Sequence, residues 1–131
     1  MDALATGLIA VVRNFGAAWD RLDLAAITAM LHDDVRYENG PLPVLRGRES
    51  VSDYLRSAVA PVQACEWIFR TIAANGDEVL TERIDVLRVG NTEVRLPVMG
   101  VFAIADGRIR EWRDYFDLAA YRAQWPREES T

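Results

Sequence analysis

Two side chains of opposite charge lie two positions apart in a segment with apolar residues on both faces. The segment Glu78–Val89 (EVLTERIDVLRV) is rich in β-branched and aliphatic residues, which predicts a strand. Side chains alternate along a strand, so Arg83 and Asp85 share one face while Ile84 and Val86 take the other. This pattern predicts a sheet that is covered on both sides. A charge buried in such a layer needs a partner or a function.

Three further polar side chains fall on segments that can join the same layer. The residues of Val35–Asn39 alternate in polarity, and Tyr37 and Asn39 share a face. In the expected last strand, one face carries Arg108, Arg110, Trp112, Asp114 and Phe116, and the other carries Ile109, Glu111, Arg113 and Tyr115. If the face with Asp114 turns inward, the interior receives five polar residues, namely Tyr37, Asn39, Arg83, Asp85 and Asp114.

Two carboxylates beside one guanidinium, in an apolar setting, suit acid and base catalysis on a small neutral substrate. Arg83 can hold both aspartates through its planar set of donors, while burial raises the pKa of a carboxyl group and a cation lowers it. One aspartate can then stay protonated as an acid while the other is ionised as a base. Tyr37 and Asn39 offer the donors and acceptors that fix a water molecule. These roles favour the hydrolytic opening of a strained ring, such as an epoxide.

Apolar spacing and turn signals predict helices first and strands afterwards. Apolar residues recur at helical spacing over residues 3–21, and Asp23 can cap a second, shorter helix that extends through Leu31. The polar run His32–Asp34 predicts a break, and the tail from Pro126 to Thr131 is expected to fray. Further helices are expected over 48–58 and 117–121, and strands over 35–39, 62–73, 78–89, 93–105 and 108–116.

This order of elements predicts one α+β domain over residues 1–131, with helices laid on one face of a curved antiparallel sheet. Such a sheet makes a cone, and the layer between sheet and helices can stay partly open as an apolar pocket. Six residues are candidates for its lining: Trp19, Leu87, Leu96, Val98, Phe116 and Tyr121. Packing in the core explains any one of these six equally well.

Composition argues against several classes of partner. The chain has 131 residues, 50% of them hydrophobic, and a net charge of −5, which disfavours binding to nucleic acid or to an anionic membrane. It has no apolar run of membrane-spanning length, and Met1-Asp2-Ala3 lacks the basic start of a signal peptide, so a cytoplasmic location is expected. With one cysteine, Cys65, and one histidine, His32, no metal site and no cofactor are expected.

Three segments, VRYENGPL, LTERIDVL and IREWRDYFDL, resemble the limonene epoxide hydrolase family, within the superfamily of ketosteroid isomerases and polyketide cyclases. The resemblance extends from about Phe15 to Tyr121, and the R-x-D and W-R-D-Y-F-D elements are its specific part. It implies a nuclear-transport-factor-2-like, or cystatin-like, fold and a reaction in one concerted step without a covalent ester. It also implies a role for each polar residue: Asp114 as general base on water, Tyr37 and Asn39 as the other holders of that water, Asp85 as acid to the epoxide oxygen, and Arg83 as the bridge.

A homodimer acting on a small or medium apolar epoxide is the expected form of the protein. The outer face of the sheet, which carries Ile84 and Val86, needs cover, and a second subunit is the simplest source of it. The resemblance also implies a dimer. The apolar candidates for the lining favour an apolar epoxide over a charged one, with water as the second substrate.

Two other functions stay open. A ketosteroid isomerase-like or polyketide cyclase-like enzyme needs a carboxylate base beside a carbonyl group and neutral donors at its oxygen. Arg83 between two aspartates fits that chemistry less well, because a carboxylate held by a cation is a weaker base. A non-catalytic ligand-binding domain is the other alternative, since a fold does not fix a function. Taken singly, Tyr37 is explained as a core aromatic residue and Asn39 as a turn residue before Gly40.

Overall fold

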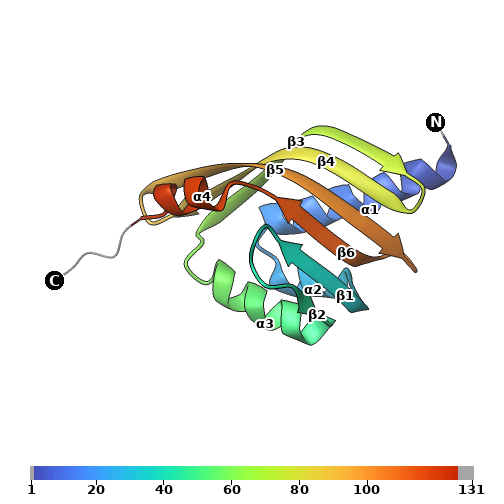
Figure 1. The fold of residues 1–131 in the computed structure, drawn as a ribbon, viewed down its shortest axis with the longest axis horizontal. Coiled ribbons are helices and arrows are strands. Elements are labelled where there is room, and N and C mark those ends of the chain that lie inside the picture. Colours follow the sequence, from blue (N-terminus) through green and yellow to red (C-terminus); the bar gives the residue numbers. More distant parts are fainter. Residues whose placement is uncertain (1, 127–131) are drawn as a thin grey trace.

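Four long antiparallel strands dominate the computed structural model, which describes residues 2–126 (Figure 1). They are β3 (Ala64–Asn75), β4 (Glu78–Val89), β5 (Thr92–Ala105) and β6 (Arg108–Tyr115). Each is paired with the next in the chain through a tight turn. In the turn between β5 and β6, Asp106 and Gly107 have φ angles of 54° and 72°, and two residues with positive φ match the twist of the strands they join.

The sheet is completed by two strands from the first half of the chain. β1 (Leu31–Asn39) pairs with β6, and β2 (Leu45–Arg46) pairs with β1, which gives the order β2-β1-β6-β5-β4-β3. The predicted antiparallel meander is confirmed for β3 to β6, but β1 and β6 are parallel. No hairpin joins these two strands, so the chain imposes no antiparallel direction on them. The short strand β2 was not predicted.

Four helices pack around this sheet, and the predicted α+β class is confirmed. They are α1 (Ala3–Asp20), α2 (Leu24–Ala29), α3 (Arg48–Val59) and α4 (Leu118–Gln124). Asp2, Asp23 and Asp117 each cap a helix by accepting a hydrogen bond from a backbone N–H three residues on. Figure 1 shows α1 alongside the long strands, α3 beside β1 and β2, and α4 at one end of the sheet.

The predicted break at His32–Asp34 is wrong, because these residues belong to β1. Leu31 lies opposite Ile109 and Arg36 lies opposite Glu111, so five steps along β1 face only two along β6. The extra residues bulge out of the ladder, which accommodates their polar side chains within a strand.

A second irregularity corrects the predicted faces of β6. Ile104 lies opposite Ile109 and Ala103 opposite Glu111, so Arg110 is an extra residue between them. The bulge shifts the alternation of side chains by one position. Ile109 is therefore buried on the inner face with Trp112 and Asp114, whereas Arg108 and Arg110 are exposed; the prediction had grouped these two arginines with Asp114.

The core lies between the inner face of the sheet and helices α1 to α3. Five aromatic rings meet edge to face or stacked within it: Phe15, Trp19, Trp67, Phe102 and Trp112. None of the helices within residues 2–126 combines the length and apolar character that a membrane span needs. Residues 127–131 of the predicted frayed tail lie outside the described part of the chain.

Candidate active site

One buried arginine joins two aspartates from different strands. Arg83 lies on β4 with its side chain fully buried. Its Nε donates to Oδ1 of Asp85 at 2.8 Å and its Nη2 donates to Oδ2 of Asp85 at 3.2 Å. The same Nη2 donates to Oδ2 of Asp114, on β6, at 2.7 Å. The structure thus brings together the three charged residues that the sequence analysis singled out, with the guanidinium between the carboxylates.

A glycine on the intervening strand makes this bridge possible. Strand β5 runs between β4 and β6, and Gly100 lies opposite Thr81 on one side and Asp114 on the other. A Cβ at Gly100 would collide with Nη1 of Arg83 and lie 2.6 Å from Oδ1 of Asp114. Because Gly100 has no side chain, the guanidinium of Arg83 can pass over β5 at this position. Sequence reasoning missed Gly100, although a glycine inside an apolar strand signals a close approach.

Two further residues fix the plane of the guanidinium. Nη1 of Arg83 donates to the hydroxyl of Thr81 at 3.3 Å, and that hydroxyl donates to the carbonyl oxygen of Gly100 at 3.0 Å. On its flat side, Cζ of Arg83 lies 4.0 Å from the centre of the Trp67 ring, which attracts the cation and limits rotation of its plane. All the side-chain nitrogens of Arg83 therefore have partners. Thr81 and Trp67 hold the guanidinium in the orientation in which it donates to Asp85 and Asp114.

The two carboxylates differ in their environment. Burial raises the pKa of Asp85 from its ordinary value of 3.8 to about 6, although the charge and hydrogen bonds of Arg83 act to lower it. Both oxygens of Asp85 accept hydrogen bonds from Arg83. Asp114 uses only Oδ2 in this way, and its Oδ1 is buried without a hydrogen-bond partner among the described residues. Asp114 thus retains an unused acceptor, while Asp85 is a carboxyl group whose pKa is raised by burial.

The cation itself stays charged. Burial acts to lower the pKa of Arg83, but the two carboxylates, Asp114 more than Asp85, raise it above its ordinary value. With Asp85 protonated, the three groups carry one positive and one negative charge. A neutral cluster of this kind is the least costly state for ionisable groups that are buried away from bulk water.

Tyr37 and Asn39 lie beside Asp114 on the neighbouring strand. In the parallel pair, Tyr37 lies opposite Trp112 and Asn39 opposite Asp114. The ring of Tyr37 stacks on Trp112 with centroids 4.1 Å apart. Burial raises the pKa of Tyr37 well above its ordinary value, so its hydroxyl stays protonated. The side chains of both residues line the same cavity as Asp85 and Asp114.

That cavity has a volume of about 150 Å³ and lies between the sheet and helices α1, α3 and α4. Its walls are largely aromatic and aliphatic. The six residues predicted as lining all border it, namely Trp19, Leu87, Leu96, Val98, Phe116 and Tyr121. Sequence reasoning missed the contribution of α3, from which Tyr54, Leu55, Ala58 and Val59 also line the cavity. The arrangement places two carboxyl groups and two neutral polar groups in one apolar chamber.

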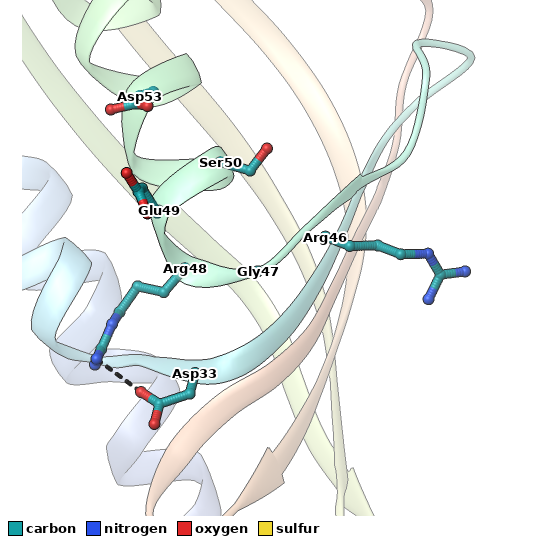
Figure 2. Close-up of a pocket in the computed structure, with 7 residues that line it drawn as sticks. All are labelled: Asp33, Arg46, Gly47, Arg48, Glu49, Ser50 and Asp53. Atoms are coloured by element: carbon teal, nitrogen blue, oxygen red, sulfur yellow. Dashed lines mark ion pairs between the residues drawn. The ribbon is translucent and has the colours of Figure 1, made fainter.

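A wider hollow of about 640 Å³ lies at the start of α3, and among the described residues no such set of buried polar groups borders it. Figure 2 shows Arg46 and Arg48 on its border extending in opposite directions. Nη2 of Arg48 is bound to Oδ1 of Asp33 at 2.7 Å, and most of the bordering residues are exposed. Because no buried titratable group faces this hollow, the smaller cavity is the candidate active site.

The described part of the chain has no group of three or more His, Cys, Asp or Glu side chains arranged to hold a metal ion. His32, half-buried on β1, accepts a hydrogen bond at Nδ1 from the backbone N–H of Asp34 at 3.0 Å. Cys65 is a buried free thiol whose pKa is raised to about 12 by burial, which keeps it protonated and unreactive.

Comparison with known proteins identifies several relatives. The model of the limonene-1,2-epoxide hydrolase catalytic domain matches residues 6–127. The epoxide hydrolase EphG of Mycobacterium tuberculosis is 40% identical over 107 residues, which make up 82% of this chain and 71% of that protein. The structure of an LEH-like epoxide hydrolase of M. tuberculosis is 38% identical and matches with a TM-score of 0.81 over 92% of this chain and 90% of the other.

More distant structures share the fold alone. A protein of Catenulispora acidiphila with a ketosteroid isomerase-like fold, in complex with trimethylamine, is 20% identical, with a TM-score of 0.77 over 87% of this chain and 90% of the other. A protein of Xanthomonas campestris that is described as a polyketide cyclase is 22% identical, with a TM-score of 0.81 over 93% of this chain and 98% of the other. The predicted nuclear-transport-factor-2-like fold, which is that of the ketosteroid isomerase-like proteins, is thereby confirmed.

Proposed function

The chain belongs to the limonene-1,2-epoxide hydrolase family and is an epoxide hydrolase, and from this premise we propose that it opens its substrate to a vicinal diol by direct attack of water in one step. The observation that carries the proposal is the contrast between the two aspartates on Arg83. Asp114 has a free acceptor in a buried site, whereas burial raises the pKa of Asp85 to about 6. This contrast supports Asp114 as the base and Asp85 as the acid.

On the base side, Asp114 takes a proton from the attacking water. Tyr37 and Asn39 are its neighbours across the strand pair and border the same cavity, so they can hold the water beside the carboxylate. As the water oxygen forms its bond to an epoxide carbon, one of its protons passes to Asp114 and the other stays on the new hydroxyl group. No covalent ester with the protein forms.

On the acid side, Asp85 delivers its proton to the epoxide oxygen as the carbon–oxygen bond breaks. The ring thus gains one proton from Asp85 while water loses one to Asp114. Asp85 is neutral and Asp114 ionised at the start, and the reverse holds at the end. The net charge of the two aspartates and Arg83 together is therefore zero throughout. Because Arg83 is bonded to both carboxylates, it stabilises the ionised form of either one.

The substrate is a small or medium apolar epoxide. The cavity of about 150 Å³ has mainly aromatic and aliphatic walls, and both of its carboxyl groups are already bonded to Arg83. Such walls favour an apolar substrate, because a charged one would lose its hydration without gaining a partner.

The active form is a homodimer that associates through the outer face of the sheet. Met99 and Tyr115 lie opposite each other there and are 53% and 50% exposed, and Leu80 is 39% exposed. Exposed apolar residues flanked by charged ones are typical of an interface. We also place the protein in the cytoplasm, which a buried free Cys65 supports.

A panel of apolar epoxides, offered to the purified protein without added metal or cofactor, tests this function. Formation of diol is expected from the wild type. Asp114→Asn and Asp85→Asn should each lower turnover by roughly 10²- to 10⁴-fold, because each removes one proton transfer, while both variants stay folded. A wild type that binds an epoxide without forming diol, unchanged by Asp114→Asn, would instead indicate a binding domain.

A further inference from the structure

One hydrogen bond at the active site involves a residue that the reaction itself does not require. Nδ2 of Asn39 donates to the hydroxyl oxygen of Tyr54 at 3.1 Å. Asn39 lies on β1 and Tyr54 on α3, so the contact joins the sheet to a helix across the cavity. Both side chains border the cavity, and no described residue donates to Oδ1 of Asn39.

The backbone holds Asn39 beside the base. Asn39 lies opposite Asp114 in the parallel pair, and the N–H of Gly40 donates to the carbonyl oxygen of Asp114 at 2.8 Å. The position of the side chain is therefore fixed, but the direction of its amide is not. An amide group can present either its oxygen or its NH₂ group to a neighbour at little steric cost.

The proposed reaction distinguishes between these two directions. The attacking water has two hydrogens, and Asp114 accepts one of them. The second needs another acceptor, which Oδ1 of Asn39 provides only when Nδ2 is turned away. In the opposite direction, the NH₂ group of Asn39 would face the water. It would then donate to the water oxygen and occupy a lone pair that must attack the epoxide.

We propose that Tyr54 is a positioning residue that sets the direction of the Asn39 amide, so that Oδ1 accepts a hydrogen bond from the attacking water. The inference rests on the proposed function. The hydroxyl oxygen of Tyr54 accepts from Nδ2, which leaves Oδ1 without a described donor and open to the water. Tyr54 is held in place by α3, on which Tyr54 and Ala58 lie one turn apart and both border the cavity.

Removal of the Tyr54 hydroxyl should lower turnover through Asn39 alone. Tyr54→Phe should reduce kcat by about tenfold, as expected for loss of one hydrogen bond, and leave KM within about twofold. In an Asn39→Ala background, the same substitution should change kcat by less than about twofold. Ser57→Ala removes a hydroxyl from an exposed position of α3 that does not border the cavity, and it is the matched control.

The side-chain amide itself gives a readout that does not depend on activity. The sequence has four Asn and two Gln residues, so few side-chain NH₂ signals occur in a nitrogen-15 spectrum, and Asn39→Ala identifies the pair of Asn39. Tyr54→Phe should move that pair and leave those of Asn14, Asn75 and Asn91 in place.

Two results would overturn the proposal. One is an Asn39 signal that Tyr54→Phe does not move. The other is an equal loss of kcat with and without Asn39, which would make Tyr54 an independent part of the cavity wall. A wild type that opens no epoxide, combined with a moved Asn39 signal, would refute the proposed function and with it the catalytic role of Tyr54, while the contact itself would stand.

Discussion

At the scale of single residues, the behaviour of the site depends on which aspartate beside Arg83 holds a proton. Arg83 carries one positive charge, and both carboxyl groups are bonded to it in a buried layer. If both were ionised, the cluster would carry a net negative charge away from water. A proton on Asp85 removes that charge and is also the proton that the proposed reaction delivers to the epoxide oxygen.

The protonation of Asp85 should appear in the pH dependence of activity. Its pKa of about 6 means that the acid form is lost as the pH rises through 6. We expect kcat/KM to fall about tenfold per pH unit above pH 6, because kcat/KM follows the protonation state of the free enzyme. A profile that stays flat from pH 6 to pH 9 would contradict the role of Asp85 as acid.

The same pKa makes stability depend on pH. Because the pKa is raised from 3.8 to about 6 in the folded protein, this contribution is fully present below pH 3.8 and is lost as the pH rises through 6. Relative to Asp85→Asn, which does not titrate there, the wild type should lose roughly 1.5 kcal/mol of unfolding free energy between pH 5 and pH 8. Urea denaturation at both pH values measures this difference, and parallel changes in the two proteins would contradict it.

Arg83→Lys should be poorly tolerated although it keeps the charge. An ammonium group cannot donate to Asp85, Asp114 and Thr81 from a fixed plane or lie flat on Trp67. We expect a loss of about 2–4 kcal/mol in unfolding free energy and at least about a hundredfold loss of turnover. Arg110→Lys, at the exposed bulge of β6, is the matched control and should change neither quantity. A fully active Arg83→Lys enzyme would show that only the charge is needed.

Single residues could be predicted from the sequence where the strand period was regular. Arg83 and Asp85 share a face by simple alternation, and Asp114 follows from the same rule counted from Trp112. Their supports could not be predicted in this way. Thr81 is the exception, because it lies two residues before Arg83 on β4 and shares its face. Trp67 and Tyr54 act through contacts between elements that are distant in the chain, and alternation along one strand carries no information on such contacts.

At the scale of elements, the site depends on three adjacent strands and on the gap that Gly100 leaves in the middle one. Arg83 and Asp114 belong to β4 and β6, which do not touch directly, and the guanidinium crosses β5 above Gly100. The strand pairing fixes this crossing, because Gly100 lies opposite both Thr81 and Asp114. A residue with a side chain at this position would separate Asp114 from Arg83.

Gly100→Ala should therefore disrupt the site. The added methyl group would push against Nη1 of Arg83 and Oδ1 of Asp114. We expect about 1–3 kcal/mol of lost stability and a fall in turnover of about a hundredfold. Gly7→Ala on α1, where nothing lies within 4 Å of the added Cβ, is the control; it should keep full activity and gain about 0.5–1 kcal/mol. Full activity of Gly100→Ala would show that Arg83 does not need this space.

The elements could be predicted closely where turns and apolar periods were strong. The bounds expected for β4 agree with the structure, and those of α1, α3 and β5 differ from it by one residue. Errors occurred at bulges, in β1 and at Arg110, because an inserted residue shifts the alternation and leaves no local signal in the sequence. The parallel pairing of β1 with β6 depends on the long connection between them, which local patterns do not describe.

At the scale of the whole molecule, the sheet has two unequal faces. The inner face carries the candidate active site and the core. The outer face carries a row of apolar residues, Ile68, Ile84 and Pro97, opposite one another on β3, β4 and β5. Met99 and Tyr115 extend the apolar area toward β6. Covering this face with a second subunit would bury it without blocking the cavity on the other side.

Met99→Arg should weaken the dimer. In an interface formed by two copies of this face, the two new charges would repel each other, and the apolar contact of Met99 would be lost. Light scattering after size exclusion should give about twice the chain mass of 14.7 kDa for the wild type and a smaller mass for the variant. Leu4→Arg, on an apolar residue of α1 that is 65% exposed, should leave the dimer intact. A monomeric wild type would contradict the proposed assembly.

The proposed reaction is a direct attack of water on the epoxide, in which Asp114 and Asp85 exchange protonation states beside Arg83. A single-turnover reaction with excess enzyme in oxygen-18 water tests it most directly. If Asp114 acts as a base, the diol formed in the first turnover carries the label. An unlabelled diol in that turnover would mean that its oxygen came from a carboxylate of the protein, and direct attack by water would be wrong.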